Sequence, residues 1–194
     1  LCDRCIVLDK GKVVFEGDVE EAIGVYMCNS SKSDNYVDLS KAKRNANMCP
    51  GIRFEAVGSL NEAGWSIMTG EKLKYQIHLK ATNDLTEVGY RHGLYTASGD
   101  IITLMIAPKI IDCKAGQELT IPLEADVSAL VPGQYYLTVV LYRSNEYGGY
   151  YFYDQVEKAV IFDVNTTLGF NDNMPWDHRG WGNVKFPDIR DLRQ

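Results

Sequence analysis

Residues 134–155, QYYLTVVLYRSNEYGGYYFYDQ, hold seven of the twelve tyrosines in the chain. A phenol ring combines an apolar body with a polar hydroxyl, so tyrosine can either fill a core or form a platform for a ligand. Aromatic residues are common in strands, and cross-strand aromatic pairs stabilise hairpins by about 0.2–1 kcal/mol. Packing therefore explains any single tyrosine, whereas an exposed cluster of them favours a ligand site.

Alternation along residues 135–143 divides this segment into two faces, because successive side chains of a strand point to opposite sides. One face is aliphatic enough to be core and consists of Tyr135, Leu137, Val139 and Leu141. The face that we expect to point outward consists of Tyr136, Thr138, Val140 and Tyr142. After the turn at residues 146–149 the hairpin register decides which side faces out. We expect Tyr151 and Tyr153 outward, because Phe152 has no polar group and is the better core residue.

The rest of residues 51–194 supplies the strands that would position this hairpin. Period-two alternation with a turn about every ten residues predicts an all-β fold, an antiparallel immunoglobulin-like or jelly-roll β-sandwich. Residues 73–80 place His78 on a polar face, opposite a face formed by Leu73, Tyr75, Ile77 and Leu79. Residues 88–107 predict two strands around a turn at Gly99, and residues 158–164 predict another strand. Leu119, Ile121 and Leu123 should point inward, and Pro122 outward on an edge strand or at a bulge.

The first 50 residues follow a different pattern. Residues 1–27 predict a hairpin, with strands CIVLD and KVVFEG around Lys10 and Gly11, and then a helix capped at Asp18. Residues 28–50 are polar, lack an apolar period and predict a linker. Because the sequence begins without Met, we expect it to be a fragment of a longer protein.

Composition argues against several classes of function. A formal charge of -6 without a run of Lys or Arg disfavours nucleic acid as a partner. No apolar stretch reaches the roughly 18–20 residues that span a bilayer, so we expect a soluble chain. Cys2 and Cys5 form a C-x-x-C without a second pair, so no metal or other cofactor is expected. Glu146 and Asp154 could face each other across the hairpin, but three histidines without catalytic spacing predict that the chain is not an enzyme.

Two stretches resemble a known family. Residues 1–27, which begin LCDRCIVLDKGKVVFEGDVEEAI, resemble the C-terminal tail of an ABC-transporter nucleotide-binding domain in the order Cys2-Asp3-Arg4, Lys10-Gly11 and Gly17. The order of TGEKLKYQIHL, GLYTASGDII, LVPGQYYLTVVLY and VIFDV resembles the C-terminal domain of Wzt-type ATP-binding subunits of polysaccharide (O-antigen-like) ABC exporters. The chain has no G-x-x-x-x-G-K-[ST] motif, so it cannot hydrolyse ATP even if the full-length parent does.

The resemblance implies a cytoplasmic domain, peripheral to the inner face of the plasma membrane, that recognises a lipid-linked polysaccharide and couples this recognition to export. It also implies a transmembrane permease subunit as a partner of the full-length protein. A homodimer that exchanges its last strand, around residues 181–186, is a further implication. The alternative is a structural dimerisation or partner-docking module that never contacts sugar.

A sugar presents a flat patch of C–H groups and a rim of hydroxyls, so its site needs an aromatic plate with planar donors and acceptors beside it. Tyr136, Tyr142, Tyr151 and Tyr153 are the candidate plates. Arg91, Tyr95 and His78 are the candidate rim, although a histidine on a polar face is often simply solvated. Trp181 could stack on sugar, and with Trp176 it could equally plug the end of the sandwich or form a dimer contact.

Overall fold

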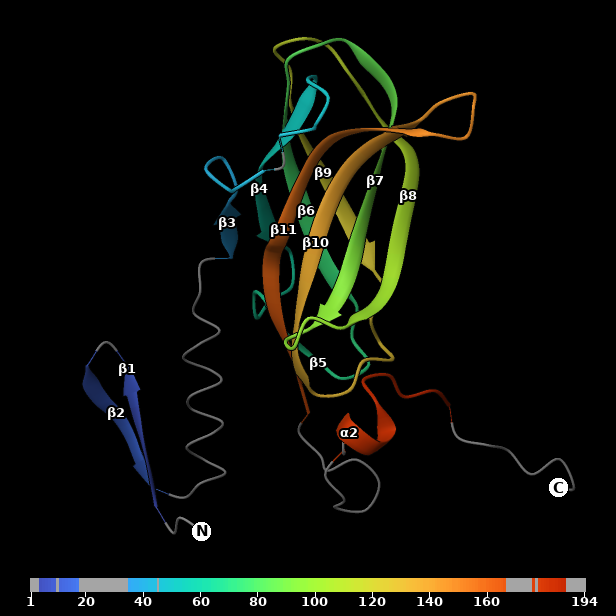
Figure 1. The fold of residues 1–194 in the computed structure, drawn as a ribbon. Helices are drawn as coiled ribbons and strands as arrows, with labels where there is room; N and C mark the ends of the chain where they lie inside the picture. The colour runs from blue at the N-terminus through green and yellow to red at the C-terminus, as the bar shows by residue number, and fades with distance from the viewer. Residues whose placement is uncertain are drawn as a thin grey trace, which may run out of the picture.

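Alternating sequences of residues 36–165 form two sheets that pack face to face (Figure 1). The computed structural model of the chain describes residues 4–9, 11–17, 35–44, 46–166, 176 and 178–187. One sheet has the order β5 (Ser66–Met68), β11 (Tyr150–Asn165), β10 (Gly133–Ser144), β7 (Leu85–Thr96) and β8 (Ile101–Cys113). The other has the order β3 (Tyr36–Asp38), β4 (Ile52–Ser59), β6 (Leu73–Ala81) and β9 (Glu118–Ala125). The predicted β-sandwich is therefore confirmed.

The core lies between the two sheets and consists of the inward faces of the strands. The two faces predicted as core on residues 73–79 and 135–141 are buried throughout, as predicted. β9 lies at an edge of its sheet, and Pro122 is exposed there, which confirms the position expected of a residue without an N–H. The turn at Gly99 joins β7 to β8 with a positive φ of 101°.

A polar cluster interrupts this apolar core. The hydroxyl of Tyr75 lies 3.1 Å from that of Tyr90 and 3.0 Å from Nδ1 of His92. Burial disfavours the charged imidazolium and lowers the pKa of His92 to about 4. Burial also raises the pKa of both tyrosine hydroxyls, so the cluster is neutral near pH 7.

Three features of the sheets differ from the prediction. β11 is one strand of 16 residues, because the predicted hairpin strand and the strand over residues 158–164 run on through a bulge. β5 pairs with β11 in parallel, an exception to the antiparallel pattern. β3 lies within the segment predicted as a linker, where Tyr36 pairs with Gly58 of β4.

The C-terminal part of the described chain lies at one end of the sandwich (Figure 1). After the short helix α2 (His178–Trp181), Val184 forms an antiparallel bridge with Leu130. The amide of Lys185 donates to the carbonyl of Ala129 at 2.8 Å. The predicted late strand is thus a short pairing within the same chain, and its exchange between two protomers stays a prediction.

The predicted N-terminal hairpin is confirmed as β1 (Cys5–Asp9) and β2 (Lys12–Gly17). Gly11 adopts a φ of 78° in the turn, a conformation that glycine reaches without strain. The helix predicted to begin at Asp18 lies outside the described residues. In the described part of the chain, none of the helices has the length and hydrophobicity of a membrane-spanning segment.

Candidate functional site

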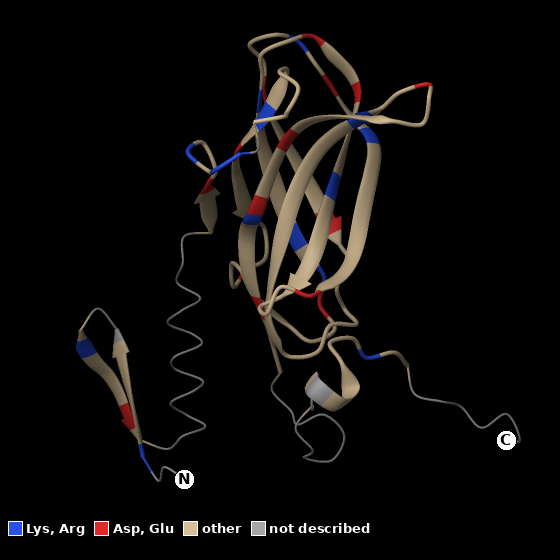
Figure 2. Ribbon diagram, viewed as in Figure 1, with Lys and Arg blue, Asp and Glu red and all other residues tan. Residues whose placement is uncertain are grey.

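The outer faces of the two sheets differ in chemistry. The outer face of the four-stranded sheet carries ion pairs, including Lys80 with Glu118 between β6 and β9 at 3.2 Å and Arg53 with Glu55 within β4 at 2.6 Å. On the five-stranded sheet, residues 134–142 of β10 carry no charge, and Figure 2 shows charged residues on β11 beside it as well as on β7 and β8. The outward side chains at residues 89–95 of β7 and 136–142 of β10 include three tyrosines, and Arg91 is the only charged residue among them.

Tyr95 and Tyr136 form a stacked pair on that face. They are directly paired between β7 and β10, and their ring centroids lie 5.0 Å apart with 5° between the ring planes. A Cβ atom at Gly93 would lie 2.7 Å from the ring of Tyr95, so only glycine lets this ring lie so close to its own strand. The ammonium of Lys158 lies 5.0 Å from the centroid of the Tyr136 ring, within the range of a cation–π contact.

A bulge in β11 brings Lys158 to this position. Leu137 pairs with Val160 while Val139 pairs with Val156, so three residues of β11 lie opposite Thr138 of β10. Lys158 has a φ of 48°, in the left-handed region. Bulges redirect side chains in this way, and here the bulge presents a cation beside the tyrosine pair.

The tyrosine pair borders a hollow of about 760 Å³. This tyrosine hollow is lined by Tyr95, Tyr136, Thr138, Gln155, Glu157 and Lys158, together with residues 42–44. Its size falls within the roughly 300–1,000 Å³ of small-molecule sites. The lining of the tyrosine hollow thus combines an aromatic wall with a hydroxyl, an amide and charges of both signs.

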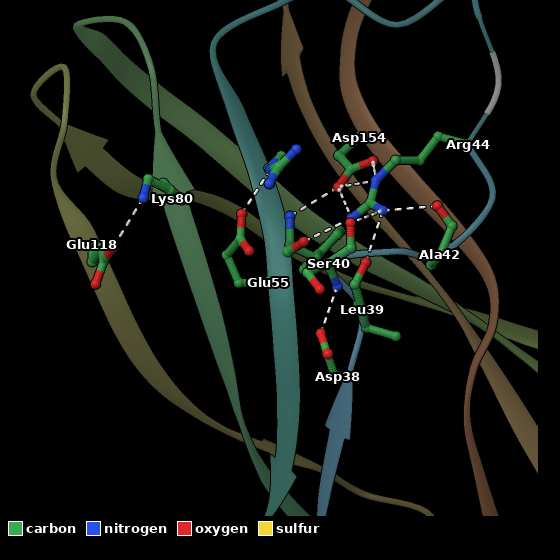
Figure 3. Close-up of polar contacts among 11 residues, drawn as sticks. Asp38, Leu39, Ser40, Ala42, Arg44, Glu55, Lys80, Glu118 and Asp154 are labelled. Carbon is green, nitrogen blue, oxygen red and sulfur yellow. Dashed lines mark hydrogen bonds and ion pairs between the residues drawn. The ribbon is translucent and has the colours of Figure 1, made fainter.

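Residues 42–44 are held in place by a largely buried ion pair (Figure 3). Nε of Arg44 donates to Oδ1 of Asp154 at 3.0 Å. The Nη atoms of Arg44 donate to the carbonyls of Leu39, Ala42 and Phe54 at 2.7, 2.9 and 2.7 Å. Asp154 also accepts from the amide of Phe54 at 2.8 Å. Both side chains of the ion pair thus have hydrogen-bond partners, so the pair can hold residues 42–44 in place beside the hollow.

A second aromatic group, the arginine cluster, lies further along the same face and consists of Arg91, Tyr142, Tyr150 and Phe152. The guanidinium carbon of Arg91 lies 5.5 Å from the ring centroid of Tyr142 and 5.1 Å from that of Phe152. Tyr150 contacts the rings of both Tyr142 and Phe152, at 5.7 and 6.1 Å between centroids. Tyr142 is only 8% exposed, and its ring lies directly over Gly89.

Comparison with known proteins assigns the family. Residues 50–173 match the sequence profile of the Wzt C-terminal domain. The chain belongs to the Wzt C-terminal domain family. No curated protein matches the chain.

A solved structure from this family has a similar fold. A crystal structure of the C-terminal domain of Wzt shares 13% identity over 81% of this chain and 91% of its own, with a TM-score of 0.63. Two β-glucosidases, from Erythrobacter marinus and from Listeria innocua in complex with glucose, reach TM-scores of 0.35 and 0.33 at 8% and 16% identity. Each is matched over 59% of this chain and only 15% and 16% of its own length, and neither supports a conclusion here.

In this Wzt C-terminal domain the hairpin faces differ from the prediction. Leu141 pairs with Asp154 and Tyr142 with Phe152, so Tyr153 is the extra residue of a bulge. The prediction that Tyr153 faces outward and Phe152 inward was therefore wrong. Tyr153 packs against the core, while Phe152 lies with Arg91 on the outer face. Tyr151 is half-exposed and pairs with Arg143, on the side of the ribbon opposite Tyr142.

The other predicted site residues divide between four places. Tyr95 and Tyr136 border the tyrosine hollow, and Arg91 and Tyr142 belong to the arginine cluster. His78 lies on the opposite sheet, where Nδ1 is 3.0 Å from Oγ1 of Thr120. Trp181 belongs to α2 at the end of the sandwich, with its ring 5.5 Å from that of Trp176.

Sequence reasoning missed Lys158, Gln155 and residues 42–44 as parts of the hollow. A bulge leaves no clear mark in alternation, so the position of Lys158 was not predictable from it. The signal that was available is Gly93, two residues before Tyr95, since a glycine inside a strand often marks a close approach. Within the described residues, no three His, Cys, Asp or Glu side chains are grouped so that they could hold a metal ion.

Proposed function

We propose that this Wzt C-terminal domain binds a polysaccharide in the tyrosine hollow and couples that recognition to export by an ABC transporter. The observation that carries the proposal is the parallel pair of Tyr95 and Tyr136 beside a hollow with polar side chains. An aromatic wall next to hydroxyl, amide and carboxylate groups matches the C–H patches and hydroxyls of a sugar. Nothing in this arrangement requires a cofactor.

In this proposal a sugar ring packs against the tyrosine pair while its hydroxyls reach Thr138, Gln155 and Glu157. Lys158 contacts the Tyr136 ring in the free domain, and its flexible side chain can move aside when a sugar takes its place. The wall at residues 42–44 does not need to move, because Arg44 is bound to Asp154. The site is then largely pre-formed, which limits the entropy lost on binding.

The affinity expected of this site is weak. Each stacked ring removes on the order of 100 Å² of apolar area from water, which contributes about 2.5 kcal/mol before the costs of association. Two contacts of this kind give dissociation constants between roughly high micromolar and millimolar. A weakly held glycan can be released to the transporter, and two sites in a homodimer with an exchanged last strand would add avidity.

We further propose that the N-terminal hairpin completes a nucleotide-binding domain on the cytoplasmic side, next to a transmembrane permease subunit. Ile6, Leu8 and Val13 of β1 and β2 are more than half exposed. Adjacent exposed apolar side chains are characteristic of a surface that another part of a protein covers. These exposed side chains therefore favour a contact between the hairpin and a further domain.

The proposal can be tested by titrating the chain with the surface polysaccharide of its own producing organism. Two-dimensional NMR of the labelled protein should show shifts for Tyr95, Tyr136 and Lys158 at millimolar sugar, and none for His78 on the opposite sheet. A titration in which no residue around the tyrosine hollow shifts would reject the proposal.

A structural docking module is the second candidate, and one observation favours it. β8 is a free sheet edge, and its residues Ile101, Leu104 and Ile106 are exposed, Ile106 by 56%. Exposed apolar edges tend to associate. If this edge carries the function, sedimentation should show a dimer that Ile106→Lys dissociates, and the polysaccharide should leave the spectrum unchanged.

A further inference from the structure

We infer that the glycan bound by this domain carries an anionic substituent, a carboxylate or a phosphate ester, and that Arg91 binds it. The inference rests on the proposed function, since it concerns the sugar held on the same face. It adds the chemical class of the ligand and the residue that selects it.

The first reason is that the guanidinium of Arg91 has no polar partner in the part of the chain that the structure describes. Within the described chain it makes no hydrogen bond or ion pair, and its Nε is buried without an acceptor. Leaving a buried charged donor unsatisfied is costly, on the order of 1–3 kcal/mol or more. By contrast, Arg44 and Arg53 on other parts of the sandwich pair with Asp154 and Glu55.

The second reason is that aromatic rings already hold the guanidinium in position. The rings of Tyr142 and Phe152 lie 5.5 and 5.1 Å from its carbon. These cation–π contacts use the charge of the group but do not satisfy its N–H donors. A planar cation with free donors is pre-organised to take two oxygens of a carboxylate or phosphate together.

The third reason is that the strand positions directly beside Arg91 carry no acidic side chain. Arg91 is paired with Val140 on one side and Ile106 on the other. The neighbouring outward positions of its own strand are Gly89 and Gly93, which have no side chain. In a chain with 26 acidic residues and a net charge of -6, these four strand neighbours of the cation are all uncharged.

The position of Arg91 suits a ligand that also fills the tyrosine hollow. Gln155, which lines the hollow, pairs with Val140 on the side of β10 opposite Arg91. Thr138, another lining residue, lies two positions from Val140 on the same face, a separation of about 7 Å along a strand. A sugar beside Tyr95 and Tyr136 can therefore direct a substituent, or the next sugar unit, toward the guanidinium.

The experiment compares three small sugars on the whole chain: methyl β-glucuronide, glucose 1-phosphate and methyl β-glucoside. The glucuronide and the glucoside differ only in a carboxylate in place of a hydroxymethyl group. Shifts at Tyr95 and Tyr136 in NMR titrations report binding at the hollow, and the Nε–H signal of Arg91 reports the anion. We expect an acidic sugar to bind about tenfold more tightly than the glucoside, because charge-assisted bonds to guanidinium are strong.

Variants separate the role of Arg91 from general charge. Arg91→Gln should remove the advantage of the acidic sugar and leave binding of methyl β-glucoside within about twofold. Arg91→Lys keeps the charge but not the planar fork, so it should retain only part of the preference. Arg53→Gln changes the same charge on the opposite sheet and serves as the matched control. Thermal unfolding of each variant shows whether the fold is intact, and any loss common to all three sugars is assigned to folding.

Three results would each be decisive. A preference for the glucuronide or for the phosphate that Arg91→Gln abolishes supports the inference, and the preferred sugar identifies the anion. Equal binding of all three sugars at the hollow overturns the inference while leaving the proposed function intact. Absence of shifts at Tyr95 and Tyr136 with all three sugars and with the organism's polysaccharide overturns both.

Discussion

Tyr95 and Tyr136 stack with 5.0 Å between their ring centroids and 5° between their planes, although they come from different strands. The alignment follows from their direct pairing between β7 and β10 and from the absence of a side chain at Gly93. Parallel aromatic pairs add about 0.5–1.5 kcal/mol beyond the burial of their area. The pair thus forms a rigid wall of the tyrosine hollow. Substitutions that remove or displace one of its rings test the proposed site most directly.

Tyr136→Ala should weaken polysaccharide binding by between about tenfold and about 70-fold, because loss of one ring contact of roughly 100 Å² removes up to about 2.5 kcal/mol of apolar burial. Tyr136 is only partly buried, so the melting temperature should fall by a few degrees, about 2–4 °C per kcal/mol for a domain of this size. NMR titration and thermal unfolding measure the two effects. Tyr147→Ala is the control, since Tyr147 is 87% exposed at the tip of the hairpin and should alter neither.

Gly93→Ala should weaken binding although it replaces no residue that lines the tyrosine hollow. The added Cβ would lie 2.7 Å from the Tyr95 ring, which must then move away from its stacked position. We expect a loss of about 1–3 kcal/mol in folding stability from this overpacking, and a matching loss of affinity. Gly58→Ala on the other sheet is the comparison, because its Cβ would meet only the flexible side chain of Gln76 at 3.4 Å and a backbone oxygen at 3.6 Å. Unchanged binding in Gly93→Ala would show that the stack is not part of the site.

Tyr142→Ala should act mainly on stability. Its ring is 8% exposed and packs with Arg91 and over Gly89, so its removal leaves a cavity. Truncation of a buried aromatic residue costs about 3–5 kcal/mol, which denaturant unfolding would detect as a lower midpoint. Tyr151→Ala, at a half-exposed position of the same hairpin, should cost less than about 1 kcal/mol. Equal costs for the two substitutions would contradict the burial of Tyr142.

Asp154→Asn should destabilise the domain by about 3–5 kcal/mol, because it leaves the guanidinium of Arg44 without its counter-ion. The same change should loosen residues 42–44 and weaken binding in the tyrosine hollow that they line. Glu118→Gln, which breaks the exposed pair with Lys80, should cost about 0–1 kcal/mol. Denaturant unfolding of the two variants gives the comparison, and similar losses would rule out the special role of Asp154.

Stability should fall as the pH falls from about 6.5 to about 4. Burial lowers the pKa of His92 from 6.5 to about 4, so in this window the unfolded chain binds a proton that the folded chain does not. The contribution of His92 to the free energy of unfolding is fully present above pH 6.5. As the pH falls through the window it declines by about 1.4 kcal/mol per pH unit, or about 3 kcal/mol in total. Hydrogen bonds lower the pKa of Asp38, Asp84 and Asp126 from 3.8, so these groups titrate below the window.

Urea unfolding between pH 4 and pH 7 measures this dependence. His92→Gln should be less stable at pH 7, because the hydrogen bond with Tyr75 changes, but its stability should depend less on pH across the window. If His92→Gln leaves the pH dependence of the free energy of unfolding unchanged, groups other than His92 cause that dependence.

Alternation and turn chemistry alone determined most of the architecture. The buried faces of β6 and β10, the turn at Gly99 and the edge position of Pro122 all follow from the period of two and from the properties of glycine and proline. The order of the motifs along the chain also indicates the Wzt family. These features are local, so a single stretch of sequence contains the information that specifies them.

Only the tertiary structure decided which side chains meet on the outer face. One bulge opposite Thr138 directs Lys158 toward Tyr136, and another at Tyr153 turns that ring inward and Phe152 outward. The sequence alternation of a strand as long as β11 is compatible with a bulge at several positions. Packing against the neighbouring strands decides at which of these positions the extra residue lies. The lack of a partner for the Arg91 guanidinium among the described residues has the same origin, because pairing between strands far apart in sequence determines what surrounds it.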